Sequence, residues 1–162
     1  MPETGHHATA SPPVLVEAPP VSPLGSARLP GFAAELANRA LLRGPDMWAG
    51  AAREAALAHL ATASPADRQA ARWDYALAQI GARHGAEALG VLDTMLGDDA
   101  DMALVPAYRL ARGVALTMLS RPADALPMLT DPMLARNPEA CLWRLLANVE
   151  ARKAAPAMAE LK

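Results

Sequence analysis

Three polar side chains near the end of the chain have the spacing of a binding face. Arg144, Asn148 and Arg152 follow one another at intervals of four residues, which places them on one side of a helix. The planar guanidinium of Arg binds carboxylates through two parallel hydrogen bonds, so this row is suited to an acidic group of a partner. A solvated row paired with Glu150 or Glu160 is the alternative interpretation.

The residues with catalytic or metal-binding chemistry do not converge in the sequence. Cys141 lies in the first turn of a predicted helix, which favours a reactive thiolate, but the lack of a nearby His favours a buried, inert thiol. His59 and His84 are far apart, and residues 98–101 lack the spacing and the Gly of a calcium loop. We therefore expect no catalytic residue, no metal site and no cofactor, in a protein that is not an enzyme.

Two apolar rows repeat the helical spacing of the polar one. One row consists of Trp73, Leu77 and Ile80 on the helix predicted at residues 66–83. The other consists of Leu110, Val114 and Met118 on the helix predicted at residues 102–119. An apolar row of this kind accepts an amphipathic helix or an extended peptide of a partner. Packing in the core, beneath a neighbouring helix, explains the same pattern.

The composition favours helices as the elements that position these rows. Ala contributes 39 residues and Leu 23, whereas Val, Ile and Thr together contribute 14. Start and stop signals such as Ser64-Pro65 and Asn137-Pro138 delimit about eight helices, with Trp48 on the apolar face of the second. We expect them at residues 32–43, 46–63, 66–83, 86–96, 102–119, 122–131, 138–153 and from 156 onward.

Small residues recur along the helices at fixed intervals. The segments around Ala88, Ala125 and Ala159 follow one another after 37 and 34 residues. Each is preceded, 12 residues earlier, by a further small residue, namely Ala76, Gly113 and Ala147. A period of this length is typical of helix pairs that stack into an array, and small residues allow the two helices of a pair to approach closely.

The last helix pair resembles a tetratricopeptide repeat (TPR). Trp143, Leu146 and Ala147 match the aromatic, Leu and small residue of the first helix of that repeat, and Ala159 matches the small residue of the second. The resemblance implies a right-handed α-α superhelix of antiparallel helix pairs with a concave binding groove. It also implies that Arg144 and Asn148 hold the terminal carboxylate of a partner peptide.

The middle pair departs from the TPR pattern, because Arg109 and Arg112 occupy the places of the aromatic residue and the Leu. The chain therefore resembles a degenerate bacterial helical-repeat protein. Its last helix begins only a few residues before Lys162, so we expect a fragment of a longer array, whose uncapped end would favour a homo-oligomer.

The chain divides into a Pro-rich arm and a helical domain. Residues 1–30 hold seven of the 15 prolines and are predicted to form an extended linker. Residues 31–162 form the repeat domain, with a divergent pair at 31–64 and repeats at 66–97, 102–131 and 138–162. An arm of this kind often follows a membrane anchor, which favours a periplasmic location, tethered by an anchor outside this sequence, over a cytoplasmic one.

Charge and composition restrict the class of partner. The net charge is −2, with acidic and basic residues interspersed, so nothing in the sequence favours nucleic acid. The expected function is a non-catalytic scaffold that binds a protein or peptide on the concave face of the array. The alternative is a carrier that encloses a lipid or another small apolar ligand between its helices.

Overall fold

The computed structural model describes residues 31–41, 43–44, 47–48 and 52–161. These residues contain helices and no strand, so the all-α prediction is confirmed for the described part of the chain. The elements that lie wholly within the described ranges are, in order, α1 (Phe32–Ala37), α2 (Arg53–Thr62), α3 (Arg68–Gly81), α4 (Gly85–Asp98), η2 (Ala100–Leu104), α5 (Pro106–Met118), α6 (Pro122–Leu129), η3 (Pro132–Leu134), α7 (Pro138–Glu150) and α8 (Ala154–Ala159), where η marks a short 3-10 helix.

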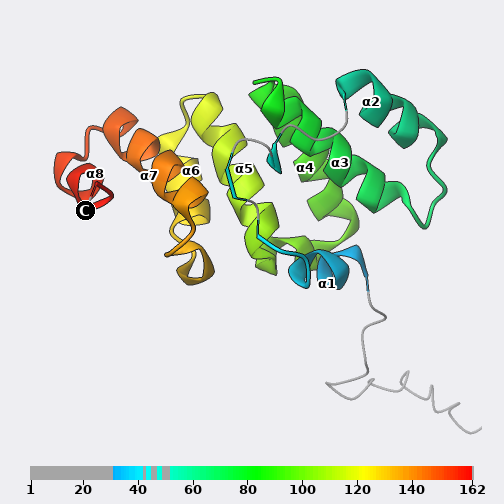
Figure 1. Cartoon of the computed structure of the whole chain (residues 1–162), viewed down its shortest axis with the longest axis horizontal. Coiled ribbons are helices and arrows are strands. Elements are labelled where there is room, and N and C mark those ends of the chain that lie inside the picture. The colour runs from blue at the N-terminus through cyan, green and yellow to red at the C-terminus, as the bar shows by residue number, and fades with distance from the viewer. Residues whose placement is uncertain (1–30, 42, 45–46, 49–51, 162) are drawn as a thin grey trace, which may run out of the picture.

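The helices succeed one another along the long axis of the molecule, from α2 at one end to α8 at the other (Figure 1). From α2 to α8, each helix contacts the next one in the chain. In addition, α3 contacts α5 and α5 contacts α7. Three helix hairpins, α3–α4, α5–α6 and α7–α8, therefore stack side by side, and the first helices of the hairpins form a continuous row.

Small and aliphatic side chains make the core between the hairpins. Ala76, Ala88 and Ala125 are fully buried, as predicted for positions of close helix contact. At Gly113 a Cβ atom would stand 2.6 Å from Leu129 Cγ, so the glycine is what allows α5 and α6 to approach this closely.

Several helix boundaries differ from the sequence prediction. The second helix begins at Arg53 rather than at residue 46, so Trp48 precedes the helix instead of lying on its face. The fifth begins at Pro106, after the separate 3-10 turn η2, because proline is favoured at the first position of a helix. Helix α7 ends at Glu150, which leaves Arg152 in the following turn.

The predicted first pair, residues 31–64, is not arranged as a fourth hairpin. Helix α1 packs on α5, whereas α2 packs on α3. In Figure 1 the blue α1 lies beside the lower end of α5, and the cyan chain that follows it runs up along α5. We call residues 31–41, 43–44 and 47–48 the leading segment.

Candidate partner-binding face

The three hairpins turn in the same way, which gives a common register for comparing them. In each hairpin, the first helix is followed by a residue with a left-handed backbone. These residues are Arg83, Ser120 and Arg152, with φ of 63°, 52° and 57°. The amide after each of them donates to the carbonyl five residues earlier, at 2.8, 3.0 and 2.8 Å. These are the hydrogen bonds of a Schellman motif, which caps the free carbonyls at a helix end.

This register corrects the predicted repeat in the last hairpin. The left-handed residues are 37 and 32 residues apart, so the counterpart of Ala88 and Ala125 is Ala157 and not Ala159. Ala157 is buried, whereas Ala159 is exposed. The shorter period arises because α6 has 8 residues where α4 has 14.

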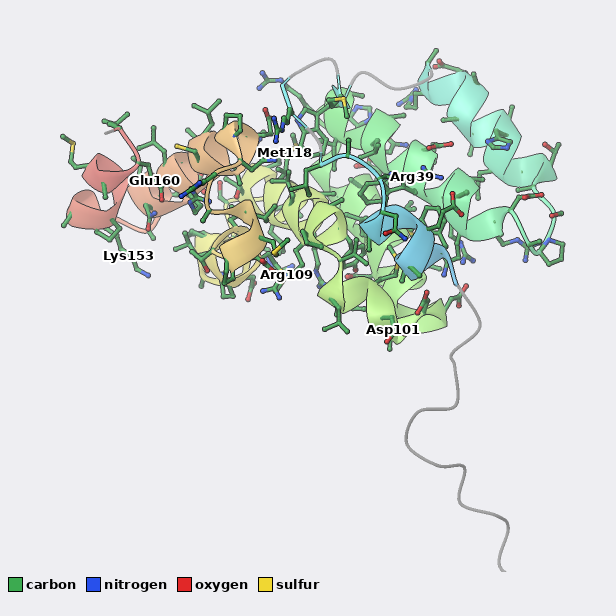
Figure 2. The ribbon with its side chains drawn as sticks, turned by 60° about the horizontal axis from the view of Figure 1, so that its bottom comes forward. Arg39, Asp101, Arg109, Met118, Lys153 and Glu160 are labelled. Atoms are coloured by element: carbon green, nitrogen blue, oxygen red, sulfur yellow. The ribbon has the colours of Figure 1, made fainter. Side chains whose placement is uncertain are left out.

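The predicted apolar rows lie in the interior. Trp73, Leu77 and Ile80 on α3 are buried, as are Leu110 and Val114 on α5, and Met118 is partly buried beside them. Figure 2 shows Met118 in the middle of the row of helices. The hydrophobic spacing therefore identified one continuous face of α3 and α5, and that face is covered in this structure.

The cover is the leading segment of the same chain. Ala33, Leu36 and Trp48 belong to the same hydrophobic cluster as the α3 and α5 rows. Leu36 and Met47 share a small pocket with Trp73 and Leu77. The chain thus lays its own apolar residues over the face on which a partner was expected.

Trp48 ends this contact with a polar link that no local sequence pattern indicates. Its indole Nε1 donates to Glu139 Oε1 at 2.6 Å, across 91 residues of sequence. The same oxygen accepts a hydrogen bond from Trp143 Nε1 at 3.0 Å. Only 6% of Trp48 and 9% of Glu139 are exposed, so one buried carboxylate satisfies two indole donors.

An open pocket of about 410 Å³ adjoins Trp48. Its wall is largely apolar and comes from the ends of α3 and α5 and the first turns of α7. The lining residues are Trp48, Ile80, Gly81, Arg83, Met118, Glu139, Leu142 and Trp143. A volume of this size, with few polar groups, is typical of sites that accept a side chain or a small ligand.

The polar row predicted on α7 has a different surrounding from the one expected. Arg144 is buried and binds a carboxylate through two parallel bonds, from Nε and Nη2 to Glu160 at 2.8 and 2.9 Å. Its Nη1 also donates to the carbonyls of Leu129 and Leu134. The predicted Arg–carboxylate chemistry is present, and the carboxylate is that of Glu160, the pairing given above as the alternative interpretation. Glu160 directly follows α8 and lies at the end of the molecule in Figure 2.

The remaining two residues of that row do not join Arg144 on an open surface. Asn148 is buried, and its backbone carbonyl accepts the bond from Lys153 that closes the turn. Arg152 is exposed, but it is the left-handed residue of the turn. The sequence analysis grouped these three residues by their charge and spacing. Whether each side chain is buried depends instead on its position in the hairpin.

Cys141 has the surroundings of an unreactive thiol. Its Sγ donates to the backbone carbonyl of Glu160 at 3.2 Å. Burial raises the pKa of the Cys141 thiol, and the hydrogen bond and the negative charge at Glu160 raise it further. Among the described residues no three His, Cys, Asp or Glu side chains are placed to hold a metal ion.

The comparisons with known proteins give no relative from which a function could be inferred. No family model, no curated protein and no solved structure matches the chain. Of the helices in the described ranges, none combines the length and the apolar character that crossing a membrane would take.

Proposed function

We propose that the protein is a non-catalytic scaffold of the TPR type, a right-handed superhelix of helix pairs that binds a protein or peptide segment along the first helices of its hairpins. Three hairpins with one kind of turn and a shared register support this proposal. So does the apolar row that continues from α3 to α5.

The observation that carries the proposal is the seat of Trp48 against Glu139. Here a segment remote in sequence lies on the first helices much as a bound peptide would, with apolar residues along the row and an indole donor at its end. The segment indicates the chemistry of the partner: a short apolar stretch followed by an aromatic side chain. The pocket next to Trp48 adds room for one more apolar side chain.

Selection from a random peptide library against the whole chain tests this function. We expect enriched peptides to share an aromatic residue and to bind with micromolar affinity or better. Met118→Lys, which places a charge in the pocket wall, should weaken binding at least about tenfold. Met133→Lys is the matched control, because Met133 is exposed and lies outside the pocket. Binding that is indifferent to Met118→Lys would refute the site, provided circular dichroism shows both variants folded.

A small apolar ligand is the second candidate, since the same pocket is lined mainly by aromatic and aliphatic side chains. Native mass spectrometry of the purified chain decides this case. A carrier should show additional mass above the 17.0 kDa of the protein, and that mass should disappear in Met118→Lys.

A further inference from the structure

One oxygen of the buried Glu139 carboxylate has no hydrogen bond from the described residues. Oε1 accepts both indole bonds, from Trp48 at 2.6 Å and from Trp143 at 3.0 Å, and Oε2 accepts none. Among the described side chains, the inaccessible polar atoms that lack a bond are Gln69 Oε1 and Arg109 Nε. Oε2 is therefore accessible, and the space that Glu139 lines is the pocket next to Trp48.

The charge of Glu139 also lacks a cation among the described residues. Asp131, the other buried acid of the described chain, pairs with Arg109 at 3.2 Å, and the partly buried Glu160 pairs with Arg144 at 2.8 Å. A buried charge is unfavourable unless it is paired. The first turn of α7 and the two indole donors compensate Glu139 in part, but neither supplies a full positive charge.

The pocket has room and suitable walls for a long side chain. Its volume is about 410 Å³, and its aliphatic wall includes Ile80, Leu142 and Met118, the last labelled in Figure 2. The side chains of Lys and Arg bury an apolar stem along such walls and end in a cation. Trp48 and Trp143 line the same pocket, and indole rings attract cations. A purely apolar occupant would leave Oε2 of Glu139 against hydrocarbon.

Arg83 is the other charged group of the pocket wall, and taken alone it would favour an anion. Its side chain forms no ion pair with the described residues. Arg83 is exposed, however, so water and salt screen its charge. Glu139 is buried, and an ion pair is several times stronger in such surroundings than in water. The attraction of Glu139 for a cation therefore outweighs the repulsion by Arg83.

We propose that this pocket binds a basic side chain, Lys or Arg, of the partner segment, with its cation hydrogen-bonded to Oε2 of Glu139. The inference rests on the proposed function, because it specifies the side chain for which the pocket next to Trp48 has room. The stem of that side chain supplies the apolar contact with the walls, and its end supplies the missing cation. The partner segment thus carries a basic residue next to its aromatic one.

A chemical-shift titration of the whole chain with three small probes tests the pocket directly. The probes are n-pentylammonium, n-pentanol and n-pentanoate, which share a stem and differ in charge. We expect pentylammonium to shift the indole N–H resonances of Trp48 and Trp143, which bond Glu139. Its dissociation constant should be at least about tenfold lower than that of pentanol, since a hydrogen bond between charged groups is stronger than one with a neutral donor. Pentanoate should bind most weakly.

Glu139→Gln tests the carboxylate itself, because an amide oxygen can still accept the two indole hydrogen bonds. We expect pentylammonium to bind this variant no more tightly than pentanol does. Glu150→Gln is the matched control, since Glu150 is an exposed acid of the same helix outside the pocket, and it should keep the preference. Circular dichroism should show native helix content in both variants. The comparison of the three probes on the unaltered chain does not depend on either variant.

Four results would overturn the inference. They are the absence of any shift with pentylammonium, equal affinity for pentylammonium and pentanol, tighter binding of pentanoate, and a preference for the cation that persists in Glu139→Gln. Failure of the proposed function gives a different result. A peptide selection that enriches no sequence would refute the scaffold and leave the binding of pentylammonium measurable. Enriched peptides with an aromatic but no basic residue would refute the present inference alone.

Discussion

At the scale of single residues, Glu139 is the most connected group of the candidate site. Its Oε1 atom receives two indole donors, one from the leading segment and one from α7 itself. A buried carboxylate is stable only when its hydrogen bonds are satisfied, so Trp48 both covers and stabilises this corner. The contact fixes the leading segment at a specific position on the hairpins.

Removing the indole donor of Trp48 tests this link. Trp48→Phe keeps an aromatic ring but loses the bond to Glu139, and we expect the free energy of unfolding to fall by about 1–2 kcal/mol. Urea denaturation measures the change. A double-mutant cycle with Glu139→Ala should give a coupling energy above about 0.5 kcal/mol. Additive effects of the two substitutions would show that the hydrogen bond contributes nothing.

The Arg144–Glu160 pair gives a prediction on pH. Hydrogen bonds from Arg144 lower the pKa of Glu160 below its ordinary value of 4.5, against the opposing effect of burial. The folded state therefore binds this proton less readily than the unfolded state. Its contribution to stability is complete above about pH 4.5 and is lost as the pH falls through the lowered pKa.

Comparison with Glu160→Gln isolates that contribution. At pH 7 we expect the variant to be less stable by on the order of 1–2 kcal/mol. The difference should shrink progressively below pH 4.5, since both chains then lack the carboxylate charge. Urea midpoints between pH 7 and pH 3 measure it, and a difference that stays constant over this range would contradict the prediction.

At the scale of helices, the hairpins share a turn but not a length. The left-handed residues at the turns are Arg and Ser rather than Gly, at a cost of about 1 kcal/mol each that the Schellman bonds and packing offset. At Gly113, within the α5–α6 hairpin, α6 leaves no room for a side chain.

Two Gly→Ala substitutions separate helix propensity from packing. In Gly90→Ala the new methyl group meets open space on α4, so we expect stability to rise by about 0.5–1 kcal/mol. Gly113→Ala gains the same propensity but presses on Leu129, and overpacking of about 1–3 kcal/mol should make it neutral or destabilising. Thermal unfolding of both variants measures the contrast, and a stabilised Gly113→Ala would mean that α6 moves away easily.

At the scale of the whole molecule, contacts run almost entirely between neighbours. Helix α5 is the exception, because it contacts α1, α3, α4, α6 and α7. In a stacked array of this kind, stability is highest where a unit has neighbours on both sides and lowest at the ends. The middle hairpin is therefore the most stable part of the fold.

Amide hydrogen exchange should display this gradient. We expect the amides of α5 to exchange most slowly and those of α1 and α2 much faster. Helix α1 has only six residues, and α2 has ten but buries a single side chain. Neither is long enough to persist without packing. Uniform protection across α1, α2 and α5 would contradict the picture of unit-by-unit stability.

Much of the architecture was predictable from the sequence, because it depends on local signals. The all-α class and the approximate places of eight helices follow from Ala and Leu content and from proline starts such as Pro122 and Pro138. The rows on α3 and α5 were found as one face, because helical spacing reports burial directly.

The parts that were not predictable depend on contacts between distant residues. Nothing near Trp48 in the sequence indicates Glu139, and nothing near Arg144 distinguishes a buried bond to Glu160 from an open clamp. The register of the last hairpin was missed for a related reason. Left-handed turns at Arg and Ser carry no glycine signal, and alanines are too frequent here to mark one position uniquely.

The link between Trp48 and Glu139 has a consequence for any measurement of partner affinity. The leading segment is covalently attached, so its occupancy of the face does not decrease on dilution. If a partner binds where Trp48 now lies, its apparent dissociation constant equals the intrinsic one divided by the fraction of molecules in which that position is vacant. A vacant fraction of about one in a hundred would weaken the measured affinity about a hundredfold. Trp48→Ala would then bind the partner more tightly than the unaltered chain does. Competition within the molecule would thus determine the partner concentration that is needed for binding.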